Sequence, residues 1–320
     1  MNLSIVTTLY KSALFIDEFY RRASASAEKL VGDDYEIIFV NDGSPDQSLD
    51  IAVSLSEVDT HVVIIDLSRN FGHHKAMMTG LSCAQADKIF LIDVDLEEEP
   101  EWLLSFNGQM AIDGCDVVYG VQRSRKGGWF ERTSGELFYR FLNAVSGLNL
   151  AQNLVTARLM SRRYVDALLL HEERELFIVG IWQLTGFDQR PQTVKKHAFS
   201  KTSYTLRKKI ALAVNAITSF SNAPLIWIFN IGAFIAITSF LFVAYLVLNW
   251  LFLTKPPSGW TSVLVSIWLV GGMVICFIGI VGIYLSKIFI ETKKRPNTII
   301  KNIISKKVGC HYASDTAGDA

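Results

Sequence analysis

The stretch KIFLIDVDLEEEPEW, residues 88–102, joins a strongly apolar run to a dense group of acidic side chains. Its beginning, KIFLI, has the length and apolar character of a buried β-strand. The run leads directly into five acidic residues: Asp93, Asp95, Glu97, Glu98 and Glu99. Carboxylates that share one place repel each other unless a cation neutralises them. The stretch therefore predicts a buried strand with a ligand site at its carboxyl end.

Four more apolar runs lie in the first part of the chain: LSIVTTLY from residue 3, YEIIFVND from residue 35, HVVIIDLS from residue 61 and CDVVYGV from residue 115. Residues 44–58 and 73–86 lie between these runs and have the apolar spacing of amphipathic helices. Such alternation predicts an α/β fold with a mainly parallel sheet and helices on both faces. The carboxyl ends of its strands would meet at one edge, where ligands bind.

Asp93 and Asp95 are two residues apart, so on a strand both side chains would project to the same side. Hard divalent cations such as Mg²⁺ bind a few carboxylates together with phosphate oxygens. A solvated acidic turn is the alternative, but direct continuation from a buried strand favours a metal site. Glu97 would support this site or belong to an exposed turn. We expect Glu98 and Glu99 in the exposed first turn of a helix, where acidic residues suit the helix dipole.

Charge and cysteine content exclude other classes of protein. The chain has 31 basic and 31 acidic residues, whereas a nucleic-acid-binding domain normally shows a basic excess. The cysteines are far apart and show neither zinc-ligand nor disulfide spacing: Cys83, Cys115, Cys276 and Cys310. Reduced thiols in a protein that faces the cytosol are the expected state.

Two later segments, residues 224–252 and 262–286, contain no charged residue. Each exceeds the roughly 20 residues that a helix needs to cross a bilayer. A buried helical hairpin in a soluble protein is the alternative, but it would need protein to cover both helices. The sequence therefore predicts three parts: an α/β domain over residues 1–222, two transmembrane helices over 223–290 and a C-terminal tail over 291–320.

Basic residues flank these two spans on their outer ends, while the connecting loop offers only Lys255. Cytoplasmic loops of membrane proteins carry an excess of Lys and Arg. We therefore expect a multi-pass protein of the bacterial inner membrane with the domain over residues 1–222 and both termini in the cytosol. The segment LRKKIALAVNAITSFSN, from residue 206, is expected to lie on the bilayer surface as an interfacial helix.

The motifs TTLY, VNDGSPDQS, SRNFGHHKA, LIDVDLEEEPE and SKTSYTLRKK, followed by the two spans, resemble the polyprenyl-phosphate glycosyltransferases. These form the membrane-anchored branch of glycosyltransferase family 2, which includes dolichyl-phosphate mannose synthases and bactoprenol glucosyltransferases. The resemblance covers about residues 3–300. It implies a GT-A fold and a nucleotide diphosphate sugar as donor, with a UDP-sugar favoured over a GDP-sugar. It also implies a polyprenyl phosphate acceptor and a homo-oligomer, with a tetramer favoured.

The same resemblance implies roles for individual residues. Six would contact the nucleotide: Thr8, Tyr10, Asn41, Asp42, Arg69 and Arg123. Mg²⁺ or Mn²⁺ would be held by Asp93 and Asp95, with Glu97 as a third ligand. The acceptor phosphate would meet Arg158, Lys201 and Arg207. Asp93, Asp95 and Arg158 would be the catalytic residues.

The sequence departs from the family pattern at three positions. Thr8 replaces a proline, and Asn41 replaces the first aspartate of DDGS. In TARLMSR, Thr156 stands where many relatives have an aspartate that is often assigned as the catalytic base. A phosphate monoester has a second pKa near 6, so a lipid phosphate is already ionised at neutral pH and needs no base. Thr156 therefore counts against an alcohol acceptor.

Two rival functions stay open at this point. One keeps the glycosyltransferase but gives it another lipid or a glycan as acceptor. The other is a catalytically inactive membrane scaffold that still binds a nucleotide. Only Thr156 supports the scaffold, while the pair Asp93 and Asp95 counts against it.

Overall fold

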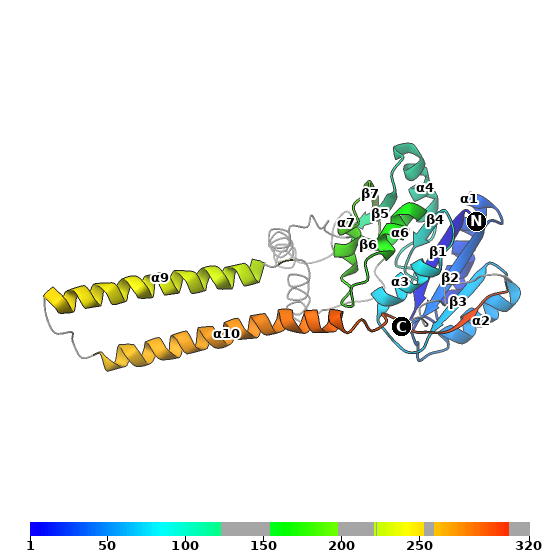
Figure 1. Ribbon diagram of the computed structural model, residues 1–320. Helices are drawn as coiled ribbons and strands as arrows, with labels where there is room; N and C mark the ends of the chain where they lie inside the picture. The colour runs from blue at the N-terminus through cyan, green and yellow to red at the C-terminus, as the bar shows by residue number, and fades with distance from the viewer. Residues whose placement is uncertain (123–153, 198–220, 222, 253–258, 307–320) are drawn as a thin grey trace, which may run out of the picture. The chain divides into compact units, whose positions relative to one another are not determined.

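A computed structural model of the chain describes residues 1–122, 154–197, 221, 223–252 and 259–306. The chain divides into two compact units. One unit contains an eight-stranded sheet with its helices, and the other contains two long apolar helices. Figure 1 labels most of the elements of both.

The sheet has the strand order β7-β5-β6-β4-β1-β2-β3-β8. Its strands are β1 (Leu3–Leu9), β2 (Tyr35–Asn41), β3 (Val62–Leu67), β4 (Lys88–Leu91), β5 (Val117–Gln122), β6 (Leu154–Ser161), β7 (Gln189–Val194) and β8 (Ile300–Ile304). The central strands β4, β1, β2 and β3 are parallel, and β5 is parallel to β7. Strand β6 lies antiparallel between β4 and β5, and β8 pairs antiparallel with β3. The predicted α/β class with a mostly parallel sheet is confirmed.

Helices cover both faces of this sheet, as predicted. Buried residues of α1 (Ile16–Val31), α2 (Ser48–Val58) and α4 (Trp102–Asp113) belong to the hydrophobic core on one face. The core of the other face contains residues of α3 (His73–Cys83), α6 (Arg162–Leu169) and α7 (Ile178–Leu184). A sheet that is buried on both faces explains why its central strands read as continuous apolar runs.

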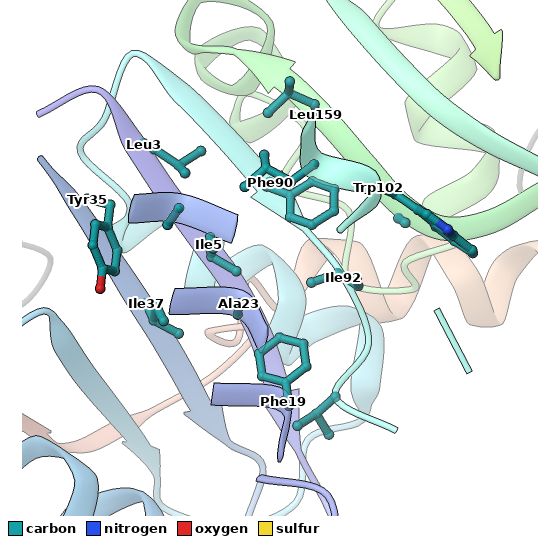
Figure 2. Packing of buried hydrophobic residues seen from close by; sticks show 14 of the residues in the cluster. Leu3, Ile5, Phe19, Ala23, Tyr35, Ile37, Phe90, Ile92, Trp102 and Leu159 are labelled. Carbon is teal, nitrogen blue, oxygen red and sulfur yellow. The ribbon is translucent and has the colours of Figure 1, made fainter. Parts of the chain in front are cut away.

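Aromatic side chains pack among aliphatic ones in the first of these cores (Figure 2). Phe19 of α1 packs edge-on against Phe39 of β2, with ring centroids 6.1 Å apart. Phe106 of α4 packs edge-on against Phe90 of β4, also at 6.1 Å, and stacks with Trp102. Such aromatic pairs add about 0.5–1.5 kcal/mol each beyond the apolar area that they bury. They hold α1 against β2 and α4 against β4, the strand that leads into the acidic stretch.

Helix α3 lies unusually close to the sheet because of one glycine. A Cβ at Gly80 would lie 2.5 Å from Val6 Cγ1 and 2.8 Å from Val40 Cγ2. A larger residue at this position would force the Val6 and Val40 side chains, or α3 itself, to move. The close packing of α3 on β1 and β2 brings its first residue, His73, to the carboxyl edge of the sheet.

The second unit contains α9 (Ala223–Phe252) and α10 (Trp260–Thr292), which contact each other. Tyr284 of α10 donates a hydrogen bond of 2.7 Å to the carbonyl of Ser221, just before α9. By length and composition, one stretch among the described residues is able to cross a membrane: Val270–Thr292, with a mean hydropathy of 2.4 and no burial. The predicted hairpin of two transmembrane helices and the predicted domain boundaries stay predictions.

Candidate active site

The carboxyl edge of the parallel strands brings together side chains from five separate parts of the chain. Thr8 comes from β1, Asp42 follows β2, His73 begins α3, Asp93 follows β4 and Thr156 belongs to β6. Gly43 allows two of these parts to touch: a Cβ there would lie 2.5 Å from the backbone nitrogen of Asn70. Its φ of +59° also favours glycine.

Asp93 is the centre of this cluster. His73 Nε2 lies 3.2 Å from Asp93 Oδ1, and Thr156 Oγ1 donates a hydrogen bond of 2.8 Å to Asp93 Oδ2. The other ring nitrogen of His73, Nδ1, lies 2.9 Å from Thr8 Oγ1. Thr8, His73 and Asp93 thus form a polar chain from β1 to the end of β4. His73 was not among the site residues predicted from the sequence.

Asp93 and Asp95 do not lie on a strand, which corrects the expected geometry. Strand β4 ends at Leu91, and the chain then turns, with Leu96 at a φ of +57°. Asp95 Oδ1 accepts a hydrogen bond of 3.0 Å from the backbone N–H of Glu97 and so stabilises this turn. The two aspartates therefore present their oxygens from a loop at the sheet edge.

Glu98 corrects a second expectation, because it is fully buried and does not lie on an exposed turn. Its Oε1 accepts a hydrogen bond of 3.0 Å from the N–H of Thr156, and its Oε2 accepts one of 2.7 Å from the N–H of Ala157. These bonds fasten the acidic loop to β6. Because Thr156 also bonds Asp93, β6 holds the loop at three points.

Glu97 is not brought together with Asp93 and Asp95 as a third metal ligand. Its Oε2 lies 3.3 Å from Lys196 Nζ, which is also 3.3 Å from Glu98 Oε1. Among the described residues, no three His, Cys, Asp or Glu side chains are gathered around one metal position. The pair Asp93 and Asp95 remains as the candidate oxygen ligands, and the role of Glu97 stays a prediction.

The charges of this cluster shift the carboxyl pKa values in opposite directions. Burial alone would raise the pKa of Asp93, but the hydrogen bond and positive charge of His73 outweigh it, so this pKa is lowered. Burial raises the pKa of Asp95, and the negative charge of Asp93 raises it further. Burial also raises the pKa of Glu98, again with a contribution from Asp93. Neighbouring carboxylates that differ in this way mark a functional site.

Asn41 and Asp42, predicted to contact a nucleotide, are both buried. Asp42 accepts hydrogen bonds from the N–H groups of Phe71, at 2.7 Å, and Gly72, at 3.1 Å. Asn41 Nδ2 donates a bond of 2.7 Å to Asp66 Oδ1 on the neighbouring strand. In this structure both side chains hold the strand-end loops in place.

Tyr10 and Arg69 lie at the same edge and are exposed. Arg69 places its guanidinium 4.3 Å from the ring centre of Phe71, and Lys11 lies over the ring of Tyr10 at 5.7 Å. Their positions agree with a nucleotide that enters from solvent. The nucleotide contacts themselves stay predictions.

Arg158 does not reach this cluster. Its side chain is 1% exposed, and its guanidinium lies 3.0 Å from the ring centre of Trp182. Burial lowers its pKa to about 10. Its Nε and Nη1 and the Trp182 Nε1 meet no hydrogen-bond acceptor among the described residues. In this structure the guanidinium therefore faces the Trp182 ring, and the predicted contact of Arg158 with an acceptor phosphate stays a prediction.

Three other predicted site residues lie outside the described residues. They are Arg123, Lys201 and Arg207. The predicted interfacial helix also lies outside them.

A family model described as glycosyl transferase family 2 matches residues 4–169, which include the strands and loops described above. The chain belongs to glycosyltransferase family 2. Membership in this family, together with the sheet and its carboxyl edge, confirms the predicted GT-A fold and the enzyme class.

This glycosyltransferase has relatives that match almost its whole length. A glycosyltransferase-named protein of Mycobacterium tuberculosis (strain CDC 1551 / Oshkosh) is 51% identical over 303 residues, which cover 95% of this chain and 88% of that protein. The bactoprenol glucosyl transferase of Shigella phage SfV is 35% identical over 306 residues, which cover 94% of this chain and 99% of that protein. The resemblance to polyprenyl-phosphate glycosyltransferases is thereby confirmed.

The glycosyltransferase is also similar to solved structures. One is glucosyl-3-phosphoglycerate synthase from Mycobacterium tuberculosis in complex with Mn²⁺ and UDP-glucose. It matches with a TM-score of 0.46 and 19% identity over 68% of this chain and 77% of that chain.

Proposed function

We propose that this glycosyltransferase transfers a sugar from a nucleotide diphosphate sugar to a polyprenyl phosphate, with inversion at the anomeric carbon. The bactoprenol glucosyl transferases that it resembles support this acceptor. A UDP-sugar is the favoured donor, and a GDP-sugar is the alternative. The observation that carries the proposal is the acidic loop, in which Asp93 and Asp95 stand at the carboxyl end of β4.

The loop suits a divalent cation, Mg²⁺ or Mn²⁺. Asp93 Oδ1 is buried, and its contact with His73 Nε2 at 3.2 Å is an ion pair of imperfect hydrogen-bond geometry. Asp95 adds a second carboxylate, and hard divalent cations prefer oxygen ligands of this kind. When bound, the ion would supply the positive charge that stabilises a departing nucleoside diphosphate.

The protein residues have three tasks in this proposal. Thr156 and His73 orient the Asp93 carboxylate through the contacts described above. Asp42 fixes the loop at Phe71 and Gly72, beside which the nucleotide would lie. Lys201 and Arg207 would attract the acceptor phosphate by charge-assisted hydrogen bonds. That phosphate is already ionised, so the reaction needs orientation and charge stabilisation more than a base.

We further propose that α9 and α10 both span the bacterial inner membrane and hold the lipid acceptor. Neither helix has an acidic residue in its first turn or a basic one in its last. Basic residues on the sequence flanks favour cytosolic ends. In this proposal the catalytic domain over residues 1–222 and the tail over 291–320 face the cytosol. We also propose that the chain assembles into a homotetramer.

The test uses membranes that contain the full chain, undecaprenyl phosphate and a panel of labelled UDP- and GDP-sugars. We expect one sugar to appear in extracted lipid, and we expect EDTA to abolish this transfer. Asp95→Ala should lose transfer by more than about a hundredfold, since it removes charge stabilisation at the diphosphate. Asp113→Ala, at the exposed end of α4, should keep normal transfer and serves as the matched control.

Each opposite result has a distinct meaning. Donor hydrolysis that needs a divalent ion, without a labelled lipid, would point to another acceptor. Absence of both transfer and hydrolysis with every donor would favour the inactive scaffold. Near-normal transfer by Asp95→Ala would remove the metal role.

A further inference from the structure

We propose that Lys196 is a built-in counter-ion of the acidic loop, which neutralises the loop without metal and opposes the binding of a divalent cation. This inference rests on the proposed metal site at Asp93 and Asp95. Lys196 would act through electrostatics and position, so it is a positioning residue that sets metal affinity. Neither the strand-end motifs nor the acidic stretch contains it.

The contacts of Lys196 place its charge inside the acidic group. Its Nζ lies 3.3 Å from Glu97 Oε2 and 3.3 Å from Glu98 Oε1, and its side chain is only 21% exposed. Glu98 is completely buried. A buried carboxylate is costly unless it is paired and hydrogen-bonded. Lys196 supplies the pairing charge, and the N–H groups of Thr156 and Ala157 supply the hydrogen bonds.

The backbone around Lys196 is fastened to the same loop. Strand β7 ends at Val194, and the next residues run beside the acidic loop. The N–H of His197 donates a hydrogen bond of 2.8 Å to the carbonyl of Glu97. His197 Nε2 also lies 2.6 Å from Glu99 Oε1. These two bonds fasten the backbone next to Lys196 to the acidic loop and so keep its side chain within reach of Glu97 and Glu98.

The field of Lys196 reaches the proposed metal ligands. Its positive charge acts to lower the pKa of both Asp93 and Asp95, in addition to its ion pairs with the two glutamates. A divalent cation bound to these aspartates would therefore feel repulsion from Lys196. Two charges of the same sign that are several ångströms apart in a partly solvated site interact enough to change a binding constant about tenfold.

The proposed role and a purely structural salt bridge predict opposite changes in metal affinity when Lys196 is removed. If Lys196 only held the loop in shape, its removal would loosen the ligands and weaken metal binding. If it competes with the cation, its removal strengthens metal binding. The direction of the change therefore separates the two explanations.

The experiment measures Mn²⁺ binding to the purified full chain in detergent, without nucleotide, from the electron paramagnetic resonance signal of free Mn²⁺. We expect Lys196→Met and Lys196→Gln to bind Mn²⁺ about tenfold more tightly than the unaltered protein. Lys196→Gln keeps a hydrogen-bond donor for Glu98 in case the methionine variant does not fold. Lys196→Arg, which keeps the charge, should bind Mn²⁺ like the unaltered protein.

Two controls make the result specific. Lys195→Met removes the same charge from the exposed neighbouring residue and should leave the affinity nearly unchanged. Asp95→Asn should abolish the measured binding in the unaltered background. Tighter binding in the neutral Lys196 variants, including binding that appears only in them, supports the proposal.

Other outcomes overturn it in separable ways. Equal or weaker binding by the neutral variants, with Asp95-dependent binding in the unaltered protein, would overturn the role of Lys196 alone. The absence of Mn²⁺ binding in all of these proteins would overturn both the proposed metal site and the counter-ion. If both neutral variants fail to fold while Lys196→Arg folds, Lys196 serves stability and the inference is wrong.

Discussion

Thr156 Oγ1 donates a hydrogen bond of 2.8 Å to Asp93 Oδ2, from the position where the family resemblance implies an aspartate. An aspartate here would place a second carboxylate against Asp93, with buried Glu98 bonded to the same backbone. Threonine instead stabilises the charge of Asp93 and adds none of its own. Threonine at this position therefore avoids a further negative charge beside Asp93 and Glu98.

Replacement of Thr156 by alanine should reduce sugar transfer by about tenfold, because a hydrogen bond to a charged carboxylate contributes about 1.5 kcal/mol or more. The backbone bond from residue 156 to Glu98 remains in this variant. The specific activity of Thr156→Ala, compared with Thr193→Ala on the exposed side of β7, checks the expectation. A loss as large as that of Asp95→Ala would mean that the hydroxyl takes part in the reaction itself.

Asn41 and Asp66 form a hydrogen-bonded pair whose amide and carboxylate can be exchanged between the two positions. Asn41→Asp alone would set two carboxylates 2.7 Å apart and should destabilise the fold by about 1–3 kcal/mol. The double variant Asn41→Asp/Asp66→Asn restores an amide opposite a carboxylate and should recover most of this loss. Lys301 loses its partner at 3.7 Å, which costs little because Lys301 is 62% exposed.

Thermal unfolding of the single and double variants, together with their affinity for UDP, measures this exchange. Recovery of both quantities in the double variant would show that Asn41 acts as a hydrogen-bond partner. If stability recovers and UDP affinity does not, the amide of Asn41 has a separate contact with the nucleotide.

The sequence predicted the strands and their acidic edge because both depend on local patterns. Apolar runs of strand length and polar residues at their ends are visible without any knowledge of tertiary contacts. The mixed part of the sheet was harder to predict. Strand β6 inserts antiparallel between β4 and β5, although it follows β5 in the chain, and its pairing depends on long-range contacts.

The missed site residues have distant partners in the sequence. Glu98 is buried because the N–H groups that it accepts lie 58 and 59 residues later in the chain. His73 bridges to Thr8, 65 residues earlier, and Arg158 is covered by Trp182 of α7. The expectation of an exposed turn for Glu98 was wrong, because it rested on local helix preferences and the tertiary hydrogen bonds to β6 bury this side chain. These contacts can be predicted only once the position of β6 between β4 and β5 is known.

Gly43→Ala should impair the site more than Gly114→Ala does, although the two replacements impose similar backbone strain. Both Gly43 and Gly114 have left-handed φ angles, of +59° and +64°. A Cβ at Gly114 meets nothing within 4 Å, whereas one at Gly43 would lie 2.5 Å from Asn70 N and 2.6 Å from Arg69 C. Gly114→Ala should therefore cost only about 1–2 kcal/mol of stability.

The Gly43 variant should lose stability beyond this amount and should also weaken UDP binding, because the loops after β2 and β3 must separate. Thermal unfolding and UDP titration of the two variants check this. Equal effects would mean that the loop contact at Gly43 is unimportant for the nucleotide.

Glu98 should make the stability of the fold depend on pH in a specific direction. Burial raises its pKa to about 7, above the value of about 4.3 in an unfolded chain. Between these two values the folded state binds more protons than the unfolded state, so stability falls as pH rises. Residue 98 cannot titrate in Glu98→Gln, so the stability of this variant should fall less steeply as pH rises. The variant also weakens the bonds to β6.

The thermal unfolding midpoint of the detergent-solubilised protein, measured across this pH window, gives the comparison. His73 also has a raised pKa, because the hydrogen bond and charge of Asp93 outweigh the effect of burial, and it contributes a decline of the same sign. The relevant quantity is therefore the difference in slope between the unaltered protein and Glu98→Gln. Parallel slopes would show that Glu98 stays ionised throughout, held by Lys196 and the two N–H groups of β6.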